Sequence, residues 1–329
     1  MQLRDLGEFG LIGRIARAAA RAGVAGGRDV VLGIGDDAAL LRPRAGEDVA
    51  VTTDALVEGV HFAWATMDAR TLGRRALLVN LSDLSAMGAR PLGCTIALAA
   101  PPALPAARAL GLMRGAIDVA RAAGCPLVGG NVTRATETSL HVTAVGAVRR
   151  GRALRRDAAR AGDRVFVTGV LGAAALAVAR ARRERVMLRR LPPLRLAAGR
   201  ALGTLRERGA CIDVSDGLLA DLGHVLESSG VGASIVVRAL PLVPGFARAC
   251  ARAAEDPVAL ALCGGEDYEL LFTLRAGAPD AGRLGRRLGA PVAEIGRIEA
   301  RGGLRLLGLS PEQRRRLARV RDAGGWRHF

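Results

Sequence analysis

Hydrophobic and polar positions follow two different spacings in the first half of the chain. Short apolar runs predict strands, at residues 49–53, 92–99, 126–128 and 140–148. Longer Ala-rich stretches with helical spacing predict helices at 70–88 and 104–123. Strands and helices that follow one another in this way are typical of an α/β architecture.

A charged, glycine-containing turn at residues 149–152 interrupts this pattern, and we place a domain boundary there. Beyond it the alternation returns, with strands predicted at 164–168, 211–214, 233–237 and 268–274. Helices are predicted from residue 173, over 194–208 and up to 228. The last helix begins at Ser310, where Pro311 and Gln313 complete a helix N-terminus signal. We therefore expect two domains of the α/β (α+β) class, residues 1–149 and 150–329.

Composition agrees with a folded two-domain chain and limits its chemistry. Half of the 329 residues are apolar and 24% are charged, so the chain has enough apolar surface for two cores and is not wholly disordered. It contains no lysine, so all 48 basic residues counted as Lys or Arg are arginines. This excludes a Walker-A loop, a pyridoxal Schiff base and the strand lysine of protein kinases. A phosphate site here must use metals, arginines or backbone N–H groups.

The net charge of +17 raises the question of a nucleic-acid partner. The arginines are scattered, however, and the one tight cluster is at residues 314–316. Aromatic residues, which stack on bases, make up only 3% of the chain. Arginine in place of every lysine is also what a GC-rich codon bias produces. We therefore predict no nucleic-acid partner.

The cysteines and histidines indicate no metal framework of the zinc type. The five cysteines are far apart and lie in apolar runs, so we expect buried free thiols in a reducing cytoplasm. The four histidines lack zinc-site spacing. The start of the chain lacks the apolar segment of a signal peptide, and the longest uncharged stretch, 91–107, contains four prolines. We predict a cytoplasmic protein without a membrane partner.

The most informative residues are acids in positions that acids usually avoid. They lie after glycines, at strand ends, inside a helix and at a strand-to-helix junction: Asp36, Asp37, Asp54, Asp83, Asp213, Asp216, Glu266 and Asp267. Each needs a cation, a metal or an N–H donor if it is buried. Single arginine partners, helix N-caps or turns remain alternative explanations for any one of them. Together, at strand ends, they favour Mg²⁺ bridging carboxylates and phosphates.

Eight motifs in chain order extend this interpretation. They are 7–12 (GEFGLI), 33–38 (GIGDDA), 52–62 (TTD with EGVHF), 79–84 (VNLSDL), 129–131 (GGN), 213–218 (DVSDGL), 264–270 (GGEDYEL) and 325–329 (GWRHF). With them the chain resembles the thiamine-monophosphate kinase family, of the aminoimidazole-ribonucleotide synthetase-like superfamily. The resemblance covers nearly the whole chain and implies that fold, with a mixed sheet packed with helices in each domain.

The resemblance also implies roles for individual residues. Mg²⁺ ligands would be Asp37, Thr52, Thr53, Asp54, Asp83, Asn131, Asp213 and Asp216. ATP would contact Gly130, Asn131, Arg156 and Ser215, and thiamine monophosphate would contact His61, Glu266 and Trp326. His61 as a polar turn residue and Trp326 as a hydrophobic plug remain the simpler alternatives. The N-terminal domain would bind ATP and Mg²⁺ and form a homodimer, and the C-terminal domain would complete the nucleotide and substrate site.

One position departs from the family's usual pattern. Asn131 stands where the commoner motif has Asp, and it keeps a carbonyl oxygen for a metal but lacks the negative charge. We expect an active enzyme that holds one metal ion more weakly. Two other functions stay open at this point, a superfamily relative that uses ATP on another acceptor and a non-catalytic binder of thiamine phosphate or nucleotide.

The expected reaction converts thiamine monophosphate and ATP to thiamine diphosphate. Because the acceptor is already a phosphate ester, both reactants carry negative charge, and several Mg²⁺ ions would reduce their repulsion. A phosphate ester with a second pKa of about 6 is already ionised near neutral pH. We therefore assign no general base.

Overall fold

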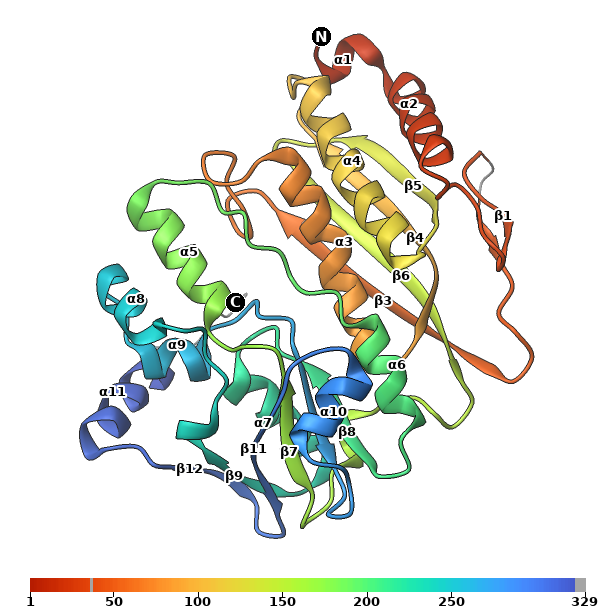
Figure 1. Cartoon of the computed structure of the whole chain (residues 1–329). Coiled ribbons are helices and arrows are strands. Elements are labelled where there is room, and N and C mark those ends of the chain that lie inside the picture. Colours follow the sequence, from red (N-terminus) through yellow and green to blue (C-terminus); the bar gives the residue numbers. More distant parts are fainter. Residues whose placement is uncertain (36–37, 323–329) are drawn as a thin grey trace. The chain divides into compact units, whose positions relative to one another are not determined.

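The computed structural model describes residues 1–35 and 38–322, which form two compact units (Figure 1). Unit 1 contains Met1–Leu84, Ala89–Gly151 and Met187–Leu196. Unit 2 contains Ser85–Gly88, Arg152–Val186 and the chain from Ala197 onward. The chain thus passes between the units more than once, and the separate roles expected for two domains stay predictions.

The core of unit 1 is a four-stranded mixed sheet. Its strand order is β3 (Glu47–Val57), β6 (Ser139–Arg149), β4 (Arg90–Ala100) and β5 (Leu127–Arg134). β6 is antiparallel to both of its neighbours, and β4 is parallel to β5. Helices α3 (Ala69–Ala86) and α4 (Ala106–Ala123) lie over one face of this sheet (Figure 1).

Side chains alternate between the two faces of the sheet, as the strand period requires. On β6, Leu140, Val142 and Ala144 are at most 1% exposed and face the helices. On the other face, Val49 and Val51 of β3 are 52% and 67% exposed. We call this second side, in the part of unit 1 that the structure describes, the open face.

Smaller elements complete unit 1. Helices α1 (Leu3–Leu6) and α2 (Glu8–Arg21) precede a short antiparallel pair of strands, β1 (Val30–Leu32) and β2 (Leu40–Leu41). α2 packs against α4 and against β5, the edge strand. Helix α2 therefore borders β5, the strand that carries Gly130 and Asn131.

Unit 2 is built on a six-stranded sheet. Its strand order is β12 (Gly303–Leu307), β9 (Gly232–Val236), β11 (Val292–Glu299), β7 (Arg164–Thr168), β10 (Leu270–Leu274) and β8 (Arg208–Asp213). Neighbouring strands are antiparallel except β12 and β9. Its helical elements are η1 (Arg156–Ala158), α5 (Ala173–Glu184), α6 (Leu196–Thr204), α7 (Leu218–Ser229), η2 (Val237–Ala239), α8 (Phe246–Ala253), α9 (Pro257–Cys263), α10 (Ala281–Leu288) and α11 (Pro311–Asp322).

Both faces of this sheet are buried, and alternation along β7 explains how. Val165 and Val167 join one core, with α5, α7, α8 and α9. Phe166 points to a second core formed with α6 and α10. There it stacks on Phe272 of β10, its neighbour across the strands, with 5.5 Å between ring centroids. Each unit is thus a mixed sheet packed with helices, as the family resemblance implied.

Some element ends differ from the sequence prediction. The strand predicted at 126–128 continues as β5 to Arg134, because pairing with β4 extends to Ala100. The helix predicted over 194–208 ends at Thr204. Beyond it the chain turns, and the Leu205 N–H donates to the carbonyl oxygen of Leu202. The turn buries both leucines, so their apolar spacing continued past the end of the helix. The strand predicted from Tyr268 begins at Leu270, since Tyr268 has a φ of 50° that a strand does not allow.

Two smaller predictions have direct outcomes. The N-terminus of α11 is as expected, because the Gln313 N–H donates to Ser310 Oγ and the Ser310 N–H donates to Gln313 Oε1. All five cysteines are free thiols, and four are buried, whereas Cys263 is half-buried.

None of the described helices combines the length and apolar character that a bilayer crossing requires.

Glycines let α3 and α4 approach with their backbones in contact. A Cβ on Gly115 of α4 would lie 2.1 Å from the carbonyl oxygen of Arg70 in α3. A Cβ on Gly73 would lie 1.8 Å from the carbonyl oxygen of Leu112. Because backbone atoms cannot rotate aside, side chains at these positions force the helices apart. This contact fixes α3, the helix that carries Asp83.

We predict that Gly115→Ala lowers the free energy of unfolding by about 1–3 kcal/mol, because the added methyl group overpacks the α3–α4 contact. Denaturant unfolding measures this loss. Gly223→Ala is the matched control, since Gly223 lies within α7 and a Cβ there meets nothing within 4 Å. The control should be neutral or more stable by up to about 1 kcal/mol, owing to the helix propensity of alanine. Equal effects of the two changes would contradict the close helix contact.

Candidate active site

Unit 1 brings three of the predicted oxygen ligands to one side of β3. The Thr52 hydroxyl donates a hydrogen bond of 2.5 Å to Asp83 Oδ2, which lies inside α3. Thr52 pairs with Ala144, and Asp54 with Val142, both fully buried on the helix side of β6. Residues two apart on a strand share a face, so Thr52 and Asp54 lie on the same side of β3 as Asp83.

Thr53 and Asn131 belong to the open face instead. The Thr53 hydroxyl donates to the carbonyl oxygen of Val142 and accepts from the Thr143 hydroxyl, at 3.1 and 3.2 Å. Asn131 pairs with Ala97 of β4, whose buried neighbours Ile96 and Leu98 face the helices. β3 and β5 are opposite edges of the sheet, three strand spacings or about 14 Å apart. Within one chain, Thr53 and Asn131 therefore cannot share a metal ion.

Gly130 has a steric role beside its predicted role at ATP. A Cβ at this position would lie 2.1 Å from the carbonyl oxygen of Ile96 in the neighbouring strand β4. Only glycine permits this approach, which keeps β5 paired with β4 up to Asn131. The glycine in this motif is therefore explained by the sheet alone, and ATP contact at Gly130 stays a prediction.

His61 lies in the turn that follows β3. Its Nδ1 accepts a hydrogen bond of 3.1 Å from the Val57 N–H, so in the neutral ring the proton is on Nε2. The next two aromatic side chains, Phe62 and Trp64, meet edge to face at 5.3 Å, and Arg108 lies 4.9 Å from the Trp64 ring. The turn contact agrees with the simpler alternative for His61 and leaves its substrate role a prediction.

Unit 2 gathers the other predicted acids where β8 ends. Asp213, the last residue of β8, is 4% exposed, whereas Asp216 is exposed. The Glu266 N–H donates to the carbonyl oxygen of Ser215 at 2.7 Å. The Tyr268 N–H bonds the Val214 carbonyl in the same way, at 2.8 Å. These bonds hold residues 213–217 beside residues 264–269, so Asp213, Ser215, Asp216 and Glu266 come together.

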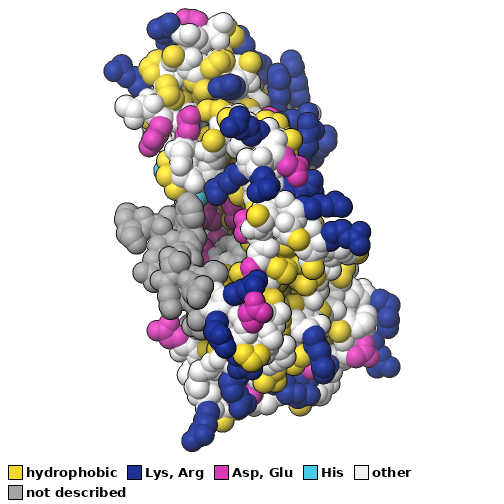
Figure 2. All heavy atoms as spheres, turned by 90° about the vertical axis from the view of Figure 1, so that its left-hand side faces the viewer, with side chains coloured by type: hydrophobic (Ala, Val, Ile, Leu, Met, Phe, Trp, Pro, Cys, Tyr) yellow, Lys and Arg dark blue, Asp and Glu magenta, His cyan; other side chains and the backbone are white. Residues whose placement is uncertain are grey.

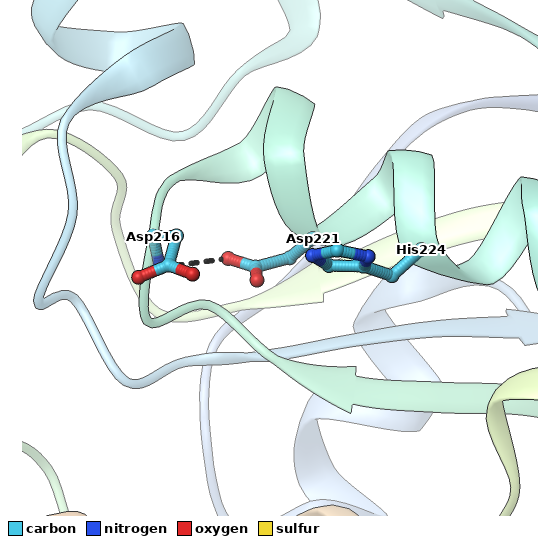
Figure 3. A group of neighbouring side chains, drawn as sticks. All are labelled: Asp216, Asp221 and His224. Carbon is cyan, nitrogen blue, oxygen red and sulfur yellow. Dashed lines mark hydrogen bonds between the residues drawn. The ribbon is translucent and has the colours of Figure 1, made fainter. Parts of the chain in front are cut away.

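Two residues that the sequence analysis did not single out adjoin this junction (Figure 3). Asp221 of α7 is 2% exposed, and its Oδ2 accepts the N–H groups of Asp216 and Gly217, both at 3.1 Å. One ligand atom from each of Asp216, Asp221 and His224 lies within 4.8 Å of the others. The signal was available: Asp221 falls between Leu218 and Leu222 on the apolar face of a helix.

Burial raises the pKa of the Asp221 carboxyl from 3.8 to about 7, and the negative charges of Asp216 and Asp213 add to this effect. The two N–H donors act in the opposite direction without cancelling it. The junction therefore holds more negative charge than its own donors compensate. Protonation of Asp221 or a bound cation relieves this excess of negative charge.

Asp267 and Glu269 have structural roles. Asp267 is 1% exposed and accepts the N–H groups of Gly172 and Ala174, at 2.5 and 3.0 Å, at the start of α5. Glu269 accepts the Thr168 hydroxyl at 2.6 Å. Helix N-termini favour carboxylates. The helix-cap alternative is thus the explanation for Asp267.

Arg156 lies elsewhere on unit 2. Its carbonyl oxygen accepts the Ser229 hydroxyl at 2.8 Å, at the C-terminal end of α7, whereas Ser215 and Asp216 precede the helix. Twelve helical residues span about 18 Å, so the Arg156 backbone is not part of the β8 junction. Asp37 and Trp326 lie outside the described residues.

Arginines are dispersed over the face shown in Figure 2, with acidic side chains between them. Every dark-blue side chain there is an arginine, because the chain has no lysine. Within the described part of the chain, several arginines form ion pairs, such as Arg90 with Asp29 and Glu47. The acids at the end of β8 differ from these arginine-paired acids, because Asp213, Asp216 and Asp221 lie close to one another.

Comparison with known proteins places these features in a family. Residues 35–148 match the model of the N-terminal domain of AIR synthase related proteins. The thiamine-monophosphate kinase of Escherichia coli K12 is 40% identical over 310 residues, covering 89% of this chain and 91% of that protein.

Two solved structures are similar over most of their length. The thiamine-monophosphate kinase of Stenotrophomonas maltophilia K279a has a TM-score of 0.79 and 41% identity, covering 91% of this chain and 96% of that one. AaThiL, complexed with AMPPCP and TMP, has a TM-score of 0.73 and 30% identity, covering 100% and 99%. The fold of this chain, its sequence motifs and its relatives all indicate the same family. The chain belongs to the thiamine-monophosphate kinase family.

Proposed function

We propose that this protein transfers the γ-phosphoryl group of ATP to thiamine monophosphate, which yields thiamine diphosphate and ADP. The main support is the AaThiL complex with AMPPCP, an ATP analogue, and TMP, because this relative covers the whole chain. The clustered acids of both units add independent support. A reaction between two phosphates requires compensating positive charge, and since the sequence contains no lysine, metal ions or arginines have to supply it.

Mg²⁺ fits the donors that the two units present. Carboxylates, hydroxyls and an amide are the hard oxygen ligands that this ion prefers. In unit 1 the proposed ligands on the helix side of β3 are Thr52, Asp54 and Asp83. Asp213 and Asp216 are those of unit 2, and Thr53 and Asn131 are those of the open face. When bound, Mg²⁺ neutralises phosphate charge and aligns the two phosphates for in-line transfer.

The residues of this chain then have positioning tasks. An oxygen of the substrate phosphate attacks the γ-phosphorus, the bond to the bridging oxygen breaks, and ADP leaves. The attacking oxygen is ionised near neutral pH, so no side chain has to remove a proton. We assign Ser215, Gly130 and Asn131 to ATP, with Arg156 reaching it only through its long side chain. His61, Glu266 and Trp326 are assigned to thiamine monophosphate.

The open face supports a homodimer as part of this proposal. Exposed valines on one sheet face, Val49 and Val51, are typical of a surface that a second copy covers. Thr53 and Asn131 lie at opposite edges of the same face. A two-fold axis presents this face to itself, which allows Asn131 of one copy to approach Thr53 of the other. Such pairing removes the obstacle that a single chain has in joining these two ligands.

The acceptor assay tests the function. With ATP and Mg²⁺, thiamine monophosphate should be phosphorylated and free thiamine should not, because the metals are set to receive a phosphate. Asp83→Asn, which keeps the shape of a proposed ligand, should lower turnover about a hundredfold or more while the melting temperature stays close to that of the parent. Equal turnover of free thiamine, or an active Asp83→Asn variant, would contradict the proposal.

The dimer is tested by placing a charge on the open face. Light scattering should give the parent twice the chain mass of 34.1 kDa, and Val51→Glu should give a folded monomer with little activity. Val51 is 67% exposed, so the change removes no core contact within the chain. Val186→Glu is the control, because Val186 is 48% exposed and lies outside unit 1. A Val51→Glu variant that remains dimeric rules out this face.

The pKa of Asp221 predicts how stability depends on pH. The folded chain keeps a proton on Asp221 up to about pH 7, whereas the unfolded chain loses it near 3.8. Stability is therefore lost as the pH rises through this range. Asp221→Asn keeps the acceptor for both N–H groups and should become more stable than the parent, by up to about 4 kcal/mol at pH 8. Melting curves in EDTA at pH 5, 6.5 and 8 measure the difference, and a gain that does not change with pH would contradict this origin.

A further inference from the structure

A groove between α2 and α4 of unit 1 collects arginines around an apolar floor. Its cavity of about 190 Å³ is lined by Arg14, Arg17 and Arg21 of α2 and by Arg114 of α4. The floor is formed by Ile15, Ala18, Leu110 and Met113. On α2 the three arginines have helical spacings of three and four residues, so they lie along one face. We call these four residues the groove arginines.

No carboxylate of the described chain forms an ion pair with the groove arginines, and α2 has no acid three or four residues away from any of them. Asp118, one turn beyond Arg114 on α4, is the natural partner for that arginine. It is bonded instead to Arg70 and Arg74 of α3, at 2.8 and 2.9 Å. Like charges at these helical spacings destabilise a helix. Among the residues that the structure describes, no carboxylate offsets the charge of this cluster.

The lining suits a small anion with more than one phosphate group. A guanidinium binds phosphate through two parallel N–H donors, and an apolar floor strengthens the field of the charges above it. A cavity of this size holds a diphosphate group, and its lining contains no aromatic side chain to stack on nucleic-acid bases. The lining also contains no carboxylate, so it does not attract cations.

The groove lies next to the strand that we assign to ATP but is a separate cavity. Ile15 and Met113 also line a second, smaller cavity, whose wall includes Gly129, Gly130 and Asn131 of β5. The arginines line only the first cavity. An anion bound in the groove is therefore next to the cavity lined by Gly129, Gly130 and Asn131 but does not enter that cavity.

We propose that the groove arginines form a binding site for a small anion with a diphosphate group, separate from the proposed active site. Inorganic pyrophosphate, ADP and thiamine diphosphate all carry this group, and they are the three ligands to compare. Binding needs no Mg²⁺, because the arginines supply the positive charge. The site is therefore independent of the proposed kinase activity.

Calorimetric titration in EDTA tests the proposal, since without Mg²⁺ the proposed active site lacks the ions that hold phosphates. We expect one pyrophosphate per chain, and at least about tenfold weaker binding by the double variant Arg17→Gln/Arg114→Gln. Arg182→Gln/Arg183→Gln is the matched control, because both residues are exposed on α5 and the net charge changes equally. The control should stay within about twofold of the parent.

Comparison of the three ligands identifies the source of the diphosphate group. Tighter binding of ADP or thiamine diphosphate than of pyrophosphate, lost in the groove variant, would support the site and name its occupant. Equal weakening by the groove and control variants would overturn the proposal, because general electrostatics then explain binding. Loss of duplex DNA or anionic-vesicle binding in the groove variant, without pyrophosphate binding in the parent, would overturn it in favour of a macromolecular surface.

Discussion

Carboxylates held out of water need a donor or a cation, and the structure of this protein depends on how each of them is stabilised. Asp267 is stabilised by the N–H groups that start α5, and Asp163 by Arg275. Asp221 has two N–H donors, yet its pKa rises to about 7, because burial and neighbouring acids outweigh them. Asp221, beside Asp213 and Asp216, is the acid whose own donors do not hold it ionised, and this excess of negative charge is where we propose a bound cation.

Backbone contacts place these acids. Gly73 and Gly115 let α3 and α4 touch, and α3 carries Asp83 to the helix side of β3, where Thr52 donates to it. Gly130 lets β5 approach β4 and extends the sheet to Asn131. Positions that look like ligand-binding glycines in a motif can therefore be required by packing, and the ligand role needs separate support.

The absence of lysine gives arginine every basic task in this chain. Guanidinium groups with acidic partners, such as Arg90 between Asp29 and Glu47, tie elements of unit 1 together. The groove between α2 and α4 differs because its acid, Asp118, is engaged by α3. Charge composition alone does not distinguish paired arginines from the groove arginines. The difference arises because Asp118 of α4 bonds arginines of α3 and not those of the groove.

The sequence by itself determined the α/β class, most strands and helices, the family motifs and the clustering of acids at strand ends, because hydrophobic spacing and local motifs are short-range properties. Element ends such as Thr204 and Leu270 were misjudged where tertiary turns override apolar spacing. Asp221 was missed although its place between Leu218 and Leu222 indicated an apolar helix face, and only the structure shows that it adjoins the end of β8. Only the tertiary structure separated Thr52 and Asp54 from Thr53 and Asn131, since strand order and register set the face and edge on which each side chain lies.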